Sequence, residues 1–179
     1  MNILEMSAQR LRPVLNWPLI RRVRQNHGLE HATIHVLSRY RYRLSGRASL
    51  NGFILIGDVP TERVQAAAEE ALRRMQRGEA HLAVHPNCGT NLLTSGFLVT
   101  LLSALAFTGT NRRAAWDRFP FALLGAIFAI LYGPLLGNQL QQHFTTSGEP
   151  GNLEIYAVRR SESRLPLLGR MVVHTILTR

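Results

Sequence analysis

Three histidines and a glutamate lie within nine residues of one predicted helix. His27, Glu30 and His31 occur in the run HGLEH, and His35 follows four residues later. At about 100° per residue, His31 lies about 40° from His27 and one turn above it, while Glu30 lies about 60° to the other side. This arrangement favours a divalent metal ion, preferably zinc. His27 and His31 would be ligands, and Glu30 would be the catalytic base that acts on a metal-bound water.

A second group of metal-binding residue types occurs in the run HPNCGTN, which contains His85 and Cys88. Pro86 and Gly89 predict a rigid turn there, facing the first helix. If His85 and Cys88 both bind the ion, the site has four protein ligands and is structural; if only one binds, a position stays open for water and the site could be catalytic. His35 lies about 12 Å along the axis from His27, so we expect it to support or pack against the site.

The motif H-x-x-E-H, formed here by His27, Glu30 and His31, resembles that of the inverted zinc-motif peptidases. The resemblance implies that both histidines are zinc ligands and that Glu30 is the general base. The glutamate that is the third ligand in that family has no counterpart here, because the corresponding position lies in an apolar segment near Phe107.

Over most of its length, the chain also resembles an uncharacterised family of small bacterial membrane proteins. A histidine-rich helix like HGLEHATIH precedes a turn like HPNCGTN and two spans in both. This resemblance implies a membrane protein and brings no activity with it.

Simpler interpretations of the same residues remain open. The short motif can occur by chance, and Glu30 could pair with Arg24 or Arg39. His81 and His85 could be ordinary residues of a short strand, and Cys88 a small buried apolar residue.

Two uncharged apolar segments, Leu92–Thr108 and Phe119–Leu136, predict membrane-spanning helices. Each is near the lower limit of the ~20 residues that cross a bilayer. Neither has the solvated polar stripe that a helix of this length in a soluble protein normally keeps, so a buried hairpin in a soluble core is less favoured. The connection Thr110–Arg118 predicts an antiparallel hairpin with Trp116 at the headgroup level.

The hairpin places both termini on one side of the cell membrane. Arginines of the carboxyl-terminal tail favour the cytoplasmic side: Arg159, Arg160, Arg164, Arg170 and Arg179. We therefore predict a multi-pass membrane protein with both termini in the cytoplasm.

Around the spans, the pattern predicts an α+β fold, a small mixed α/β domain attached to a transmembrane two-helix hairpin. Residues 1–91 would form the polar domain with the metal site, residues 92–137 the hairpin, and residues 138–179 a tail whose strands return to the polar domain. The expected elements are helices at 18–40 and 61–77 and strands at 42–50, 52–56, 81–85, 153–159 and 171–178.

These features lead to two main hypotheses. One is a zinc metallopeptidase acting on a polypeptide near the membrane surface; the other is a non-catalytic scaffold that binds another membrane protein and keeps a structural metal or a histidine network. The formal net charge of +10 comes with no lysine and 21 arginines. No nucleic-acid-binding module surrounds these arginines, so the lipid bilayer is the expected partner and nucleic acid is not.

Overall fold

The computed structural model describes residues 3–165 and 169–179 and divides into two compact units. The first unit comprises Met1–His85 and Gln142–Arg179, and the second comprises Pro86–Gln141. The first is a mixed α/β unit and the second is a pair of long apolar helices, so the predicted α+β fold with a helical hairpin is confirmed.

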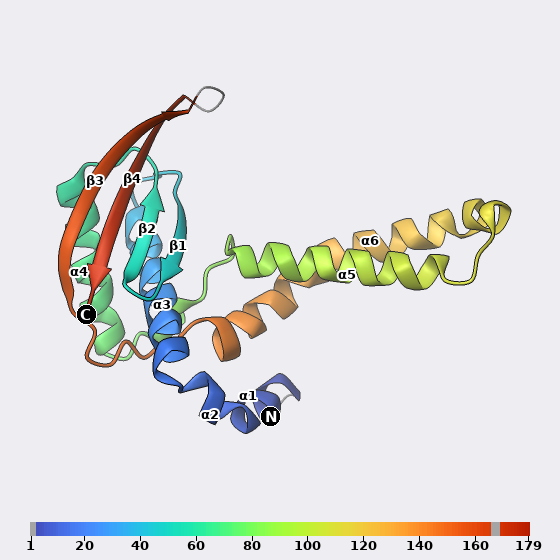
Figure 1. The fold of residues 1–179 in the computed structure, drawn as a ribbon, viewed down its shortest axis with the longest axis horizontal. Helices are drawn as coiled ribbons and strands as arrows, with labels where there is room; N and C mark the ends of the chain where they lie inside the picture. The colour runs from blue at the N-terminus through green and yellow to red at the C-terminus, as the bar shows by residue number, and fades with distance from the viewer. Residues whose placement is uncertain (1–2, 166–168) are drawn as a thin grey trace. The chain divides into compact units, whose positions relative to one another are not determined.

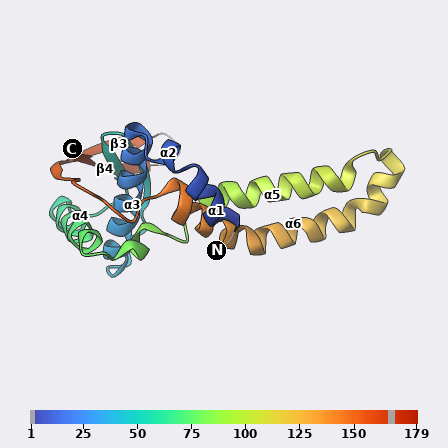
Figure 2. The same ribbon diagram turned by 90° about the horizontal axis from the view of Figure 1, so that it is seen from below.

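The mixed unit consists of one sheet and two helices that cover the same face of it. Helix α3 (Pro18–Ser38) packs on strands β1 (Ser45–Ser49) and β2 (Gly52–Ile56). Helix α4 (Thr61–Gln76) packs mainly on β3 (Ile155–Leu165) and also contacts β4 (Gly169–Thr178). Both views show the two helices on one side of the sheet (Figure 1, Figure 2).

The sheet is antiparallel throughout, with strand order β1-β2-β4-β3. The central pair joins distant parts of the chain, since Phe53 in β2 pairs with Ile176 in β4. The tail therefore completes the sheet, as its sequence predicts. Strand β1 begins later than expected, because Arg41 has a φ of 58° and the chain enters the strand only at Ser45.

The core lies between the sheet and the two helices. On α4, six residues are buried: Val64, Ala67, Ala68, Ala71, Leu72 and Met75. On α3, a buried asparagine also fixes the sheet. The Asn26 amide donates to the carbonyls of Ser49 (2.8 Å) and Leu50 (3.1 Å), and its oxygen accepts from the Thr178 hydroxyl (2.7 Å). These bonds hold α3 in a defined register against β1 and β4.

Two predictions about local structure in this unit are incomplete or wrong. Residues 81–85 do not form a strand: Ala80–Ala83 is a 3₁₀ turn, and Val84 is extended after it. The amino-terminal segment, for which no element is predicted, forms helices α1 (Ile3–Arg10) and α2 (Arg12–Leu15).

The second unit contains α5 (Gly89–Phe107) and α6 (Arg112–Leu140), which pack along each other. Both are long and apolar enough to cross a membrane. Helix α6 begins at Arg112, so the predicted connection at 110–118 is wrong in length. Asn111 caps the helix by accepting from the Ala114 N–H, and Trp116, Asp117 and Arg118 lie in the first turns of α6 instead of a loop.

Little of the surface of these two helices is covered by the rest of the described chain. A buried helical hairpin in a soluble core would have most of its residues covered, whereas only 11% of the apolar window of α5 and 17% of that of α6 are buried. The exposed side chains include large apolar residues such as Leu92, Phe97 and Leu131. This exposure favours an apolar solvent around the hairpin.

Small residues allow α5 and α6 to approach closely. A Cβ atom added to Gly133 would lie 2.8 Å from the Cα atom of Ser95, and one added to Gly137 would lie 2.8 Å from the Cα atom of Asn91. Near the same end, the Asn91 amide donates to the Asn138 side-chain oxygen (2.8 Å), and Gln141 donates to Asn91 (2.7 Å). Close contacts and side-chain hydrogen bonds of this kind hold membrane helices together.

We expect Gly133→Leu to destabilise the hairpin by about 1–3 kcal/mol, because backbone atoms of α5 occupy the space that the new side chain needs. Gly96→Leu is the matched control, since a Cβ at Gly96 meets nothing within 4 Å among the described residues. Thermal unfolding in detergent, followed by circular dichroism, checks the difference. Equal unfolding temperatures for the two variants would contradict this packing.

Candidate metal site

Helix α3 carries His27, His31 and His35 at intervals of four residues, so one side of the helix presents three imidazoles. Pro18 stands in the first turn, where its missing N–H costs nothing. The rings of His27 and His31 are neighbours, with centroids 4.4 Å apart and planes at 61°. The predicted pairing of these two histidines on one face is thus present.

Each of these rings is oriented by a backbone carbonyl. His27 Nδ1 lies 3.0 Å from the Thr145 oxygen, His31 Nδ1 lies 2.7 Å from the Ala83 oxygen, and His35 Nε2 lies 2.9 Å from the Val84 oxygen. A carbonyl oxygen can only accept, so the ring nitrogen at each contact carries the hydrogen and donates it. In a neutral ring, the lone pair then belongs to the other nitrogen, which is Nε2 in His27 and His31 and Nδ1 in His35.

The 3₁₀ turn explains why two of these acceptors are consecutive. Ala83 closes the turn and Val84 is extended, so their carbonyls meet His31 and His35, one turn apart on α3. A strand at 81–85, as the sequence predicts, would point successive carbonyls in opposite directions. The wrongly predicted element is thus the one that orients two of the imidazoles.

His85 extends the cluster from the segment that follows this turn. Its ring centroid lies 5.7 Å from that of His31 and 5.1 Å from that of His35. Burial lowers the pKa of His85 below its usual value, and the neighbouring His35 lowers it further. The neutral form is therefore favoured, which is the form that binds a metal ion.

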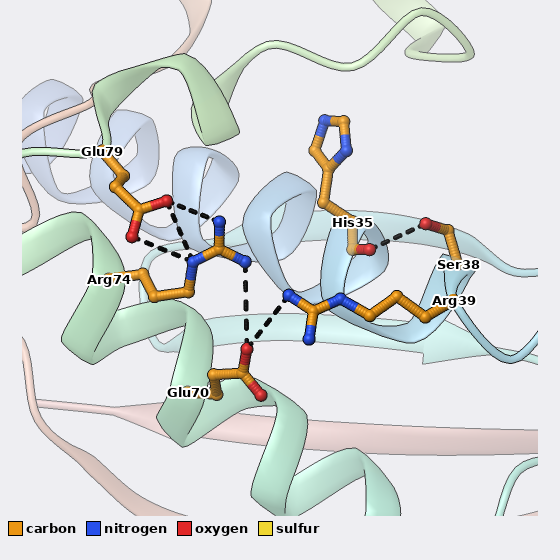
Figure 3. A network of polar contacts seen from close by, with 6 residues as sticks. All are labelled: His35, Ser38, Arg39, Glu70, Arg74 and Glu79. Carbon is orange, nitrogen blue, oxygen red and sulfur yellow. Dashed lines mark hydrogen bonds and ion pairs between the residues drawn. The ribbon is translucent and has the colours of Figure 1, made fainter.

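His35 belongs to this cluster and not to the ion pairs beside it. Arg39 of the α3 end pairs with Glu70 of α4, and Arg74 pairs with Glu70 and Glu79. Figure 3 shows the His35 ring pointing away from these ion pairs. The backbone oxygen of His35 accepts a hydrogen bond from the Ser38 hydroxyl. The ion pairs tie α3 to α4 and leave the imidazole for the contact with Val84.

Cys88 lies in the other unit, as the residue that caps the amino terminus of α5. Its sulfur accepts from the Thr90 N–H at 3.4 Å. His27, His31 and Cys88 together supply two nitrogen donors and one sulfur donor, a group that could hold a metal ion.

Glu30 is buried, with 4% of its surface exposed, and its carboxylate lies against Gly46 of β1. Asn26 lies on the same side of α3 and donates to the Ser49 carbonyl of the sheet. His31 instead bonds to the Ala83 carbonyl of the 3₁₀ turn. The two arginines considered as partners of Glu30 make other contacts. Arg39 pairs with Glu70, and the Arg24 guanidinium donates to the carbonyls of Leu15, His143 and Thr146.

The sequence does not predict the groups that orient the rings. They are the backbone carbonyls of Ala83, Val84 and Thr145, and every residue type carries a backbone carbonyl. One signal was present within the motif itself. A Cβ atom added to Gly28 would lie 3.2 Å from the Ala83 Cβ and still closer to the carbonyl oxygen of Ser147. Glycine at this position lets the segment containing Thr145 approach α3 closely enough to reach His27.

Comparison with known proteins gives two matches. A family model described as "Domain of unknown function (DUF6391)" matches residues 22–158. An uncharacterized protein of Picosynechococcus sp. (strain ATCC 27264 / PCC 7002 / PR-6) is 35% identical over 157 residues, covering 78% of this chain and 72% of the relative. No solved structure matches.

We expect Gly28→Ala to destabilise the protein by about 1–3 kcal/mol and to weaken metal binding, because the added methyl group displaces the Thr145–Ser147 segment from His27. Thermal unfolding and zinc titration of the purified protein measure the two effects. Gly96→Ala serves as the control, since it adds the same methyl group to open space on α5 among the described residues. Identical stability and affinity in both variants would contradict the role given to Gly28.

Proposed function

The chain belongs to the family described as DUF6391, and we propose that it is a membrane protein that binds a zinc ion through His27, His31, His85 and Cys88. The ion stabilises the fold and takes no part in a reaction. The hairpin α5–α6 anchors the protein in the bilayer, with both termini in the cytoplasm. This function corresponds to the second of the two hypotheses drawn from the sequence.

The observation that carries this proposal is the set of imidazole–carbonyl hydrogen bonds. Histidines that bind metals donate their other ring N–H to a carbonyl or carboxylate, which fixes the tautomer and the ring orientation. His27 and His31 both do so through Nδ1. Their Nε2 atoms are then both acceptors, which cannot hydrogen-bond to each other, whereas a cation can bind both lone pairs.

The donor types support zinc over calcium or magnesium. Imidazole nitrogen and thiolate sulfur suit zinc, whereas calcium and magnesium prefer oxygen ligands. Four ligands of this kind form the closed set that is typical of structural zinc sites. The site would lie near the membrane surface, because Cys88 immediately precedes the first residue of α5.

The position of Glu30 favours a structural ion over a catalytic one. A general base must reach the proton that it removes. The Glu30 carboxylate lies against the backbone of Gly46, on the side of α3 that faces the sheet. The peptidase hypothesis nevertheless remains the second candidate, because Glu30 is buried and is part of the H-x-x-E-H motif.

We expect detergent-purified protein to contain about one zinc ion per chain, and His27→Ala and His31→Ala each to lose most of it, because a three-ligand remnant binds more weakly. His81→Ala is the matched control, since His81 is an exposed histidine of the adjacent 3₁₀ turn. Elemental analysis by mass spectrometry provides the measurement. Equal metal content in all four proteins would remove the proposal.

The variant Glu30→Gln separates the structural hypothesis from the catalytic one. We expect it to keep its zinc and to cleave a peptide library at the same background rate as the zinc-loaded wild type, because Glu30 does not act on a substrate. Product analysis by mass spectrometry would reveal any cleavage. Zinc-dependent cleavage by the wild type that disappears in Glu30→Gln would assign the peptidase function instead.

A further inference from the structure

An exposed apolar stripe runs along the amino-terminal helices. The Leu11 N–H donates to Ser7 and the Leu15 N–H donates to Leu11, so α1 and α2 continue as one helical run. At about 100° per residue, its apolar residues Ile3, Met6 and Val14 fall within about 80° of one another, and Trp17 follows between α2 and α3. They are all exposed: Ile3 by 81%, Met6 by 41%, Val14 by 50% and Trp17 by 62%. No described residue covers this stripe, so it is available to an apolar partner.

Positive charge accompanies the stripe. Between residues 3 and 24 the chain has one carboxylate, Glu5, and five arginines: Arg10, Arg12, Arg21, Arg22 and Arg24. Arg21, Arg22 and Arg24 line a cavity of about 510 Å³, where Glu149 is the one acidic residue of the described lining, so positive charge is in excess there. A surface that combines an apolar stripe with arginines is typical of helices that lie in the headgroup region of an anionic membrane.

Arg24 adds a guanidinium to this surface whose hydrogen-bond acceptors are backbone carbonyls. Its guanidinium donates to the carbonyls of Leu15 (3.4 Å), His143 (3.2 Å) and Thr146 (2.9 Å), and all three acceptors are neutral. Burial lowers its pKa, but a guanidinium stays protonated at neutral pH. Within the described ranges 3–165 and 169–179, Arg24 forms no ion pair, so an anion in the adjoining cavity would be stabilised by it.

We propose that residues 3–24 form a binding surface for anionic phospholipid headgroups. The apolar stripe of Ile3, Met6, Val14 and Trp17 enters the boundary between headgroups and acyl chains, and Arg21, Arg22 and Arg24 bind lipid phosphates. This inference rests on the proposed membrane location, since the hairpin α5–α6 keeps the chain at a bilayer. Charge complementarity favours lipid over a second copy of the chain, which would bring five arginines against five more, and a nucleic acid would leave the apolar stripe exposed.

The two tryptophans of the chain, Trp17 and Trp116, allow a direct test. Trp116→Phe leaves Trp17 as the only indole, and the full-length variant is placed in nanodiscs of pure phosphatidylcholine or of phosphatidylcholine with phosphatidylglycerol. We expect Trp17 emission to shift to shorter wavelength, and to be quenched by lipids brominated near the headgroup, in the anionic nanodiscs. Adding Arg21→Gln and Arg22→Gln should abolish the difference in Trp17 emission between the two kinds of nanodisc. The control variants Arg73→Gln and Arg77→Gln, at the end of α4 and just after it, should retain that difference.

The controls distinguish failure of this inference from failure of the membrane location. The variant Trp17→Phe reports on Trp116 of the hairpin, and its sedimentation with vesicles after an alkaline wash reports on insertion. An inserted protein whose Trp17 emission is equal in both lipids would overturn the lipid-binding surface alone. A protein that the wash removes would overturn the membrane location and this inference together. An equal shift on adding inorganic phosphate in detergent would assign the arginines to a free anion and also overturn it.

Discussion

The donation of imidazole N–H groups to backbone carbonyls is the interaction on which this account of the protein depends. Three histidines of α3 make such bonds to two separate segments, the 3₁₀ turn and the segment that enters the tail. Each bond satisfies a backbone carbonyl and at the same time determines which ring nitrogen keeps its lone pair. A helix with several histidines becomes an oriented set of donors only because these segments approach it closely.

The close approach has its own requirements. Gly28 leaves room for the Ser147 carbonyl on one side of α3, and Gly46 leaves room for the Glu30 carboxylate on another. Asn26 ties the same helix to the β1–β2 turn and to the last strand. Helix α3 is therefore fixed by contacts on several sides, and its histidines are held by a rigid framework. Rigid support of this kind allows ligands to be arranged before the ion binds.

The sequence predicted the parts of this structure that follow from periodicity and composition. The helical spacing of His27 and His31, the helix at 61–77, the apolar helices and the return of the tail to the sheet all depend on local patterns. The strand at 81–85 was wrong because alternation over five residues does not distinguish an extended segment from a 3₁₀ turn followed by one extended residue. The hairpin connection was wrong because charged residues of the first helical turns resemble those of a loop. The carbonyl acceptors could not be predicted, since any residue can supply one.

X-ray absorption spectroscopy of the zinc-loaded, detergent-purified protein would show whether the histidines of α3 hold the ion. We expect a four-coordinate ion with one sulfur scatterer at about 2.3 Å and nitrogen scatterers at about 2.0–2.1 Å that show the multiple scattering of imidazole rings. A shell of oxygen atoms without imidazole or sulfur scattering would contradict it, because the oriented histidines of α3 would then not hold the ion.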